Sequence, residues 1–375
     1  MATTTDKLTS SIVPRRGQAL AMRTAALVRR GIRDFGREPN WVVKRVFSGR
    51  QACTAVSPAG KIGVFLGAGS ASGLRLAICD LDLDVPTESL PTPEFAEEKT
   101  PKGRSGSALV WSPTGRLLLA ASNLSSNQLQ IFDAQSKTHL ESFAVPDLPN
   151  ASFAWSPDGS LLGAAFAPDR SLRIWNCRAE MPALDETPMS SLDIAPSLAA
   201  VSIRDTTEDE VAFSGFGPMA LHPRGEAIAL ALKCAGEWAD DFLLVASVPS
   251  MRREIFVPVH GGITALAFTD DGETLIYCAG GRAFAIHNGE LESVPLFFNA
   301  ELARCHPTQP LCACYSSWLK NSSKGRIFVA DLSTGVILDG YDAESVVDIC
   351  WSYDTQQVYA VTHDGMAYVY EKTLG

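Results

Sequence analysis

The sequence predicts an all-β protein built from seven similar units, and three observations support this. One pattern, an apolar run followed by a tight turn and a second apolar run, returns seven times along the 375 residues. The 29 glycines and 22 prolines are spread along the chain instead of clustered, as expected for many turns between short strands. With 46% hydrophobic and 20% charged residues, the chain can bury a large core, so global disorder is excluded.

The repeated turn sets the register of the seven units. Proline presets φ at its second position, glycine accepts the positive φ that closes a tight hairpin, and Ser, Thr or His stands where the first strand ends. Each turn therefore predicts a β-hairpin between two apolar strands. The seven turns are Ser57–Gly60, Ser112–Gly115, Ser156–Gly159, His222–Gly225, Thr269–Gly272, His306–Gln309 and Ser352–Thr355.

A third strand that alternates apolar and polar residues follows the hairpin, as in Gln128–Asp133. This order and spacing over residues 45–372 resemble the WD40 family, most clearly in the W-S-P-x-G turns that start at Trp111 and Trp155. The resemblance implies a seven-bladed β-propeller with four antiparallel strands in each blade. The closing Trp-Asp pair of the family is degenerate here, for example Trp175-Asn176, so apolar packing is expected to hold the blades together.

Closure of the ring is expected to involve a strand near the N-terminus. WD40 propellers commonly pair such a strand with the last blade, and Trp41–Phe47 fits this role against Val346–Glu371 because it alternates and precedes the first unit. The alternative is that Trp41–Phe47 is only the outer strand of the first blade. Asn40–Phe47 and Val294–Phe298 also resemble parts of a nucleoporin of this family, but in a different blade order, so no residue role is carried over.

Two long gaps between turns predict insertions at about residues 82–105 and 179–212. The first holds four prolines, which suits an exposed irregular loop. The second is either a solvated loop or a docking surface for a basic partner. Its acidic residues are Asp205, Glu208, Asp209 and Glu210.

Residues 1–40 form a basic extension, and the propeller is assigned to residues 41–375. An amphipathic helix is predicted at about residues 17–36, because apolar residues share one face while arginines recur every seven residues. Three roles are open for it: packing on the propeller, an organelle-targeting presequence, or an exposed docking helix for a partner protein or an anionic membrane. The arginines are Arg16, Arg23, Arg30 and Arg37.

Charge is divided unevenly along the chain, whose net charge is −10. Residues 1–50 hold 11 Lys and Arg against 3 Asp and Glu, so the remainder is strongly acidic and is not expected to bind nucleic acid directly. No window approaches 18 consecutive apolar residues, and the nine cysteines lack the spacing of a disulfide framework. These features predict an intracellular protein of the cytoplasm or nucleus, or of the mitochondrion if the extension is a presequence.

Catalytic and cofactor motifs are missing from the sequence. It has no G-x-S-x-G elbow and no phosphate-binding loop followed by a helix. The one candidate metal cluster, Cys305, His306, Cys312 and Cys314, does not have the spacing of a zinc finger. No catalytic residue, metal ligand, cofactor or small-molecule substrate is therefore predicted.

One pair of arginines carries a second functional hypothesis. Arg252 and Arg253 precede the fifth unit, where the lipid-binding propellers of the PROPPIN family have a Phe-Arg-Arg-Gly motif. The flanking residues here are Met251 and Glu254, which depart from that motif and leave solvated surface arginines as the other interpretation.

A rigid ring without catalytic motifs predicts a non-enzymatic scaffold for protein–protein interactions, a subunit of a larger intracellular assembly. Its partners would bind the propeller faces and the N-terminal helix. The alternative is a peripheral membrane or phosphoinositide-binding propeller that uses the basic helix, with Arg252 and Arg253. Aromatic residues of the seventh unit are candidate partner anchors or core residues, namely Trp351, Tyr353, Tyr359, Tyr368 and Tyr370.

Overall fold

The described part of the chain consists of β-strands arranged in seven antiparallel sheets. The computed structural model describes residues 41–45, 51–67, 74–81, 88–89, 107–122, 128–144, 151–166, 170–182, 184, 187–194, 212–235, 240–248, 250–287, 294–296, 298–317 and 325–371. The helix predicted at about 17–36 lies outside these residues, as does most of the predicted insertion at 82–105.

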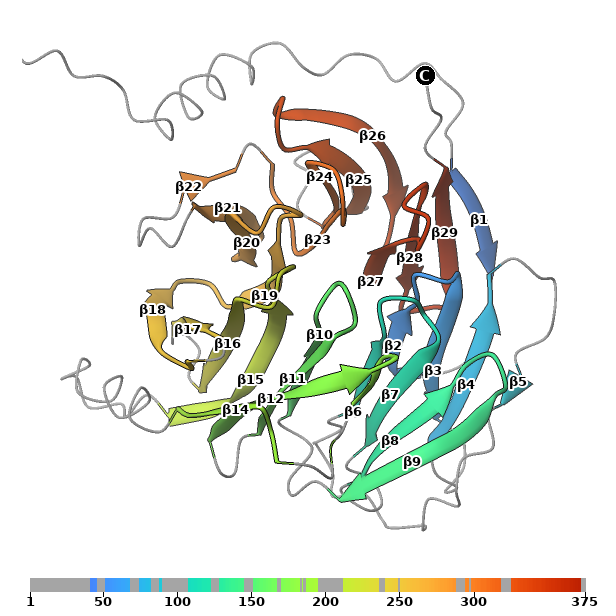
Figure 1. Cartoon of the computed structure of the whole chain (residues 1–375). Helices are drawn as coiled ribbons and strands as arrows, with labels where there is room; N and C mark the ends of the chain where they lie inside the picture. The colour runs from blue at the N-terminus through green and yellow to red at the C-terminus, as the bar shows by residue number, and fades with distance from the viewer. Residues whose placement is uncertain are drawn as a thin grey trace, which may run out of the picture. The chain divides into compact units, whose positions relative to one another are not determined.

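The sheets follow one another around a ring in chain order, from blue to red in Figure 1. Within each blade we name the strands A to D from the centre outward. Blade 1 consists of β2 (Gln51–Val56), β3 (Lys61–Gly67), β4 (Leu74–Asp80) and β5 (Glu88–Ser89). Blade 2 consists of β6 (Ser107–Trp111), β7 (Leu117–Ser122), β8 (Gln128–Asp133) and β9 (Thr138–Ala144). Blade 3 consists of β10 (Ser152–Trp155), β11 (Leu161–Phe166) and β12 (Ser171–Arg178), with β13 (Met181–Pro182) and β14 (Ser190–Asp193) both paired to β12.

The later blades repeat the same four-stranded order. Blade 4 consists of β15 (Ala212–Leu221), β16 (Ala227–Ala235), β17 (Asp241–Ser247) and β18 (Arg253–Val259). Blade 5 consists of β19 (Ile263–Phe268), β20 (Thr274–Ala279), β21 (Arg282–His287) and β22 (Val294–Pro295). Blade 6 consists of β23 (Leu302–Cys305), β24 (Leu311–Ser316), β25 (Gly325–Asp331) and β26 (Val336–Ala343). Blade 7 consists of β27 (Val346–Trp351), β28 (Gln357–Thr362), β29 (Met366–Glu371) and β1 (Trp41–Arg45).

Strand β1 closes the ring. It pairs antiparallel with β29, from Trp41 opposite Tyr370 to Arg45 opposite Met366. Val43 packs against the apolar cluster between blades 6 and 7. The closing role predicted for this segment is confirmed, and the outer strand of the first blade is instead β5, which pairs with β4.

Apolar packing fills every junction between neighbouring blades, as the sequence predicted. Each innermost strand contacts the innermost strands of the two adjacent blades. The described residues form seven buried apolar clusters, one at each junction, and each cluster draws its side chains from both neighbouring sheets. Burial of this apolar surface is the main stabilising contribution to the ring.

All seven predicted turns connect strand A to strand B, and the first residue of each is buried. In most of them its side chain accepts a hydrogen bond from the turn backbone: for example, the Leu161 amide donates to Ser156 Oγ at 2.9 Å and the Arg224 amide donates to His222 Nδ1 at 3.1 Å. The Ser, Thr or His at this position therefore supplies an acceptor that a buried turn needs.

The segment predicted as an insertion at 179–212 contributes to the ring where it is described. It contains β13 and β14, and β14 pairs with β12 from Ser190 to Asp193. Glu180 reaches blade 2, where its carboxylate accepts hydrogen bonds from Ser112 Oγ at 2.8 Å and from the Thr114 amide at 3.0 Å. One part of this segment thus braces the A–B turn of the neighbouring blade.

Tryptophans at the end of strand A link some blades through their indole N–H groups. Trp111 donates to the Ala55 carbonyl at 3.0 Å, and Trp351 donates to the Arg304 carbonyl at 2.9 Å, in each case across to the preceding blade. Trp155 occupies the same position in blade 3, but its buried Nε1 has no hydrogen-bond partner among the described residues.

This difference gives a direct measure of the indole hydrogen bond. Trp111→Phe and Trp351→Phe should each cost about 1 kcal/mol more stability than Trp155→Phe, because only the first two remove a hydrogen bond while all three lose similar ring area. Denaturant unfolding of the three variants provides the comparison. Equal losses at the three sites would contradict it.

Two histidines link neighbouring A–B turns. His306 Nδ1 accepts from the Thr308 amide at 3.1 Å, and its Nε2 lies 3.1 Å from the Thr355 carbonyl of the next blade. His222 repeats this arrangement, with a hydrogen bond to the backbone of Gly272 in blade 5. Each ring accepts at Nδ1 and donates at Nε2, which is the neutral tautomer.

Acidification should therefore destabilise the protein in part through His222. Burial lowers the pKa of this imidazole below its ordinary value of 6.5, although Glu226 acts in the opposite direction. The native state favours the neutral ring, so the stabilising contribution of His222 is fully present above the pKa that the imidazole has in the unfolded chain. This contribution is lost as the pH falls through that pKa and then through the lower pKa of the folded state. The variant His222→Ser has serine as the first residue of this A–B turn, as four other blades do. Its free energy of unfolding should fall less than that of the wild type between pH 7 and pH 5. Identical pH dependence in urea unfolding would show that His222 does not contribute.

Candidate functional site

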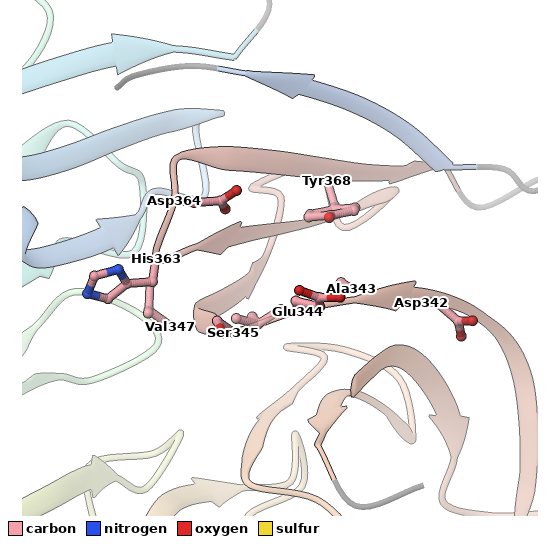
Figure 2. A pocket seen from close by; sticks show the side chains of 9 residues that line it. Asp342, Ala343, Glu344, Ser345, Val347, His363, Asp364 and Tyr368 are labelled. Carbon is pink, nitrogen blue, oxygen red and sulfur yellow. The ribbon is translucent and has the colours of Figure 1, made fainter. Parts of the chain in front are cut away.

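A pocket of about 630 Å³ opens between blades 6 and 7. It lies between the connection from β26 to β27 and the turn from β28 to β29 (Figure 2). Because consecutive antiparallel strands alternate in direction, these connections lie at the end of the blades opposite the seven A–B turns. We call this end of the ring the B–C face.

The lining of the pocket is acidic. Its three carboxylates are exposed, while Tyr368 is buried behind them. Figure 2 shows Asp364 and Tyr368 on the β28–β29 side and Glu344 with Ser345 on the β26–β27 side. None of the nine lining residues is Lys or Arg; they are Asp342, Ala343, Glu344, Ser345, Val346, Val347, His363, Asp364 and Tyr368.

Hydrogen bonds hold the two sides of the pocket in place. The His363 amide donates to the Ser345 carbonyl at 2.9 Å, which ties the β28–β29 turn to the connection between the blades. The Ser345 amide donates to the Tyr315 hydroxyl at 3.1 Å. Thr362 Oγ1 accepts from the Met366 amide at 3.0 Å and donates to Asp364, which orients that carboxylate.

The electrostatics of the pocket follow from its carboxylates. Burial, followed by the nearby charge of Asp364, raises the pKa of the Tyr368 hydroxyl. Burial and the charge of Glu301 raise the pKa of Tyr315 in the same way. Both phenols stay neutral at physiological pH, so the pocket presents negative charge beside the neutral ring of Tyr368. This combination suits a cationic group, which carboxylates and aromatic faces both attract.

The central channel forms a second cavity of about 430 Å³, lined mainly by the ends of the A strands. Val347 lines both this channel and the pocket between blades 6 and 7. Tryptophan and phenylalanine side chains, together with several turn prolines, make much of the channel wall apolar. Its ionic groups are Arg304 and Asp348, whose side chains lie 3.4 Å apart.

Asp348 has a structural role at the junction that closes the ring. Its Oδ2 accepts the Val56 amide of blade 1 at 2.9 Å, and its Oδ1 faces Arg304 of blade 6. Burial raises the pKa of this carboxyl, although Arg304 and the Val56 amide lower it in part. The group therefore joins blades 6, 7 and 1, and its hydrogen bonds are satisfied within the ring.

The structure brings few of the sequence-predicted site residues together. Arg16, Arg23, Arg30 and Arg37 lie outside the described residues, as do Asp205, Glu208, Asp209 and Glu210. Arg252 and Arg253 are exposed just before and at the start of β18, and neither lines either pocket. The Arg253 guanidinium lies over the Phe256 ring, 5.3 Å from its centroid.

The candidate metal cluster is packed as core. Cys312 and Cys314 are fully buried with their sulfurs 3.5 Å apart, and Cys305 stands opposite Cys312 in the sheet. Both nitrogens of His306 are engaged by turn backbone. Within the described ranges, no group of three or more His, Cys, Asp or Glu side chains is arranged to hold a metal ion.

The aromatic residues of blade 7 divide between core and surface. Tyr353 is 67% exposed at an A–B turn, whereas the other four candidates are buried. Tyr368 contributes to the acidic pocket, and its ring lies 5.7 Å from that of Tyr341. The acidic pocket itself was not predicted, because its two halves are separate in sequence and neither half has an unusual composition.

Comparisons with known proteins agree with this fold. The sequence profile described as "WD domain, G-beta repeat" of the WD40 family matches residues 151–176, which cover most of blade 3. A chain from the structure "Crystal Structure of Mitotic Checkpoint Complex" is similar in fold, with a TM-score of 0.59 and 13% sequence identity over 91% of this chain and 98% of that chain. A search of curated protein sequences found no significant match. In the described residues, no helix has the length and hydropathy needed to span a membrane.

Proposed function

We propose that this seven-bladed propeller, whose third blade carries a WD40 repeat, is a non-enzymatic scaffold that binds other proteins as a subunit of a larger intracellular assembly. The observation that carries the proposal is the acidic pocket between blades 6 and 7. It lies on the B–C face of a closed ring, and hydrogen bonds within the ring fix its walls before any partner binds. Such preorganisation lowers the entropic cost of binding.

The comparisons support the same function in general terms. Propellers with WD40 repeats are generally protein-interaction scaffolds, and the similar chain belongs to a structure described as a complex. We place the partner site at the acidic pocket. Exposed carboxylates beside Tyr368 favour a basic segment of a partner protein.

The lipid-binding alternative has less support from the described residues. A phosphoinositide site needs several cations that converge on one phosphate group. Arg253 instead stacks on Phe256. Arg252 is exposed, and the acidic residue Glu254 lies two positions after it in the sequence. The basic N-terminal helix on which this alternative also depends lies outside the described residues.

Affinity purification from native cells tests the scaffold proposal. The C-terminally tagged chain should co-purify with a stoichiometric set of proteins, which mass spectrometry would identify together with the N-terminus of the tagged chain. A pocket variant, Asp342→Asn with Asp364→Asn, should weaken the binding of at least one partner by about tenfold or more. Removal of an attractive charge pair from an interface costs about 1.4 kcal/mol or more, which corresponds to that factor.

A matched variant controls for the change in net charge. Glu254→Gln with Glu273→Gln removes two exposed carboxylates outside the pocket and should leave the partner set unchanged. Purification of the tagged chain alone would contradict the proposal. Binding to phosphatidylserine vesicles that is lost in an Arg252→Glu, Arg253→Glu variant would favour the lipid alternative.

A further inference from the structure

Strand β26 is the outer strand of blade 6, and it leads directly into the acidic pocket. Its last residues, Asp342 and Ala343, line that pocket. Among the described strands β26 pairs with β25 alone, so its other edge has no strand partner. At Gly340 side chains bind the backbone, because the amide donates to Asp339 Oδ1 at 2.6 Å and the carbonyl accepts from Arg326 at 3.4 Å. Figure 1 shows β26 at the periphery of the ring, opposite the central end of its blade.

The start of β26 exposes three consecutive aliphatic side chains. Val336 is 44% exposed, Ile337 39% and Leu338 45%. A register shift opposite Val329 and Ala330 leaves Leu338 without a direct partner residue on β25. Large aliphatic side chains exposed side by side on a sheet edge are typical of a surface that another chain covers.

Several other outer strands have features that discourage strand addition, and β9, which has neither Pro nor Lys, exposes one large aliphatic side chain where β26 exposes three. β18 starts with two charged residues and contains Pro258, which cannot donate a hydrogen bond to an added strand. β1 has five residues and ends in Lys44 and Arg45, while β5 and β22 have two residues each. β26 has eight residues and no Pro or Lys, so it is about 26 Å long and can pair with an equally long segment.

The charge along β26 defines the partner. Asp339 and Asp342 lie on the strand, Glu344 follows it, and Asp364 faces its end across the pocket. Pairing of β26 with β26 of a second copy would bring these carboxylates close to one another, which is unfavourable for like charges on adjacent strands. A segment with aliphatic side chains and a Lys or Arg would complement both the apolar start and the acidic end.

We propose that β26 is a strand-addition site that binds an extended segment of a partner protein, with aliphatic side chains against Val336–Leu338 and a basic side chain in the acidic pocket. Backbone hydrogen bonds along the edge that is not paired with β25 supply affinity, and the two side-chain sites supply specificity. This inference rests on the proposed scaffold function and names the surface and the chemistry of the partner.

A peptide selection on the full-length protein tests the proposal. The probe is a phage-displayed library of random 12-residue peptides. Enriched peptides should combine β-branched or aliphatic residues with a Lys or Arg. They should bind the wild type at least tenfold more tightly than an edge variant, Ile337→Lys with Leu338→Lys, and at least tenfold more tightly than the pocket variant Asp342→Asn with Asp364→Asn.

The outer strand of blade 2 provides the matched control. Leu140 on β9 is 38% exposed, close to the value for Ile337, but β9 belongs to blade 2 and the acidic pocket lies between blades 6 and 7. Leu140→Lys should leave peptide binding unchanged. Hydrogen exchange of the wild type with its selected peptide should slow at the amides of residues 336–343 and not in β9, which reports strand addition even if the edge variant does not fold.

Several results would overturn the proposal. They are the absence of any enriched peptide, equal binding by the wild type and a folded edge variant, or unchanged exchange in β26. A wild-type dimer in light scattering that becomes monomeric in the edge variant would assign the edge to a second copy. If the partner set co-purifies with the tagged edge variant as it does with the wild type, the scaffold function stands and this surface is wrong.

Discussion

Replacement of Asp241 by alanine is expected to lower the free energy of unfolding by about 3–5 kcal/mol. The Asp241 carboxylate is buried at the junction of blades 4 and 5, and it is 3% exposed. Its Oδ2 accepts from Lys233 Nζ at 2.7 Å and from the Ile263 amide at 2.7 Å. Lys233 also donates to the Ile263 carbonyl at 2.5 Å. Alanine at this position leaves a partly buried ammonium without its counter-ion and a buried amide without its acceptor.

The neighbouring residue offers a control for this prediction. Asp240 also has a polar contact, with Nδ1 of His260 at 2.9 Å, but both side chains are exposed. Asp240→Ala should therefore cost less than about 1 kcal/mol. Asp241→Asn should be intermediate, because it keeps an acceptor oxygen and loses the charge. Urea unfolding of the three variants measures the difference, and equal losses for Asp240→Ala and Asp241→Ala would show that the junction does not depend on this carboxylate.

The A–B turns illustrate what local sequence can predict. The dihedral preferences of Pro and Gly act within four residues, so the turn that starts at Ser156 has the same form wherever the chain folds. Apolar alternation placed the strands on either side for the same reason. The closing strand β1 could be predicted only as one of two alternatives, because the choice of partner depends on β29, more than 320 residues away in the sequence.

The polar links between blades could not be predicted from the sequence. Asp241, Asp348 and Glu180 each bond to a residue in another blade, and no local pattern distinguishes them from surface carboxylates. The sequence indicated that polar links of the family were mostly missing and that apolar packing dominates. The apolar clusters are present at every junction, and these carboxylates with His222 and His306 add polar links that a repeat comparison does not reveal.

The acidic pocket shows the same limit at the level of function. Residues 342–347 and 363–368 meet because β26 leads into blade 7 beside the β28–β29 turn. The predicted sites relied instead on charge runs within one segment, namely the N-terminal arginines and the cluster at Asp205–Glu210. Those segments lie outside the described residues, and their roles stay predictions.

Gly272→Ala is expected to destabilise the protein by about 3–4 kcal/mol, through two separate effects. Gly272 has a φ of +74°, a left-handed conformation that costs an L-residue about 1–2 kcal/mol. A Cβ at this position would also overlap Nε2 of the buried His222 ring. His222 would have to move, which breaks its hydrogen bond to the backbone of Gly272 and disturbs its edge contact with Phe268.

Two further variants separate the backbone effect from the clash. Gly262 has a φ of +71°, but a Cβ there would lie 3.6 Å from Asp241 Oδ2, an ordinary contact distance. Gly262→Ala should therefore cost about 1–2 kcal/mol, the penalty of the left-handed conformation alone. In a His222→Ser background the clash at Gly272 disappears, so the cost of Gly272→Ala should fall to that of Gly262→Ala. If this cost is the same in both backgrounds, His222 and Gly272 are not coupled, and the link between the turns of blades 4 and 5 does not stabilise the ring.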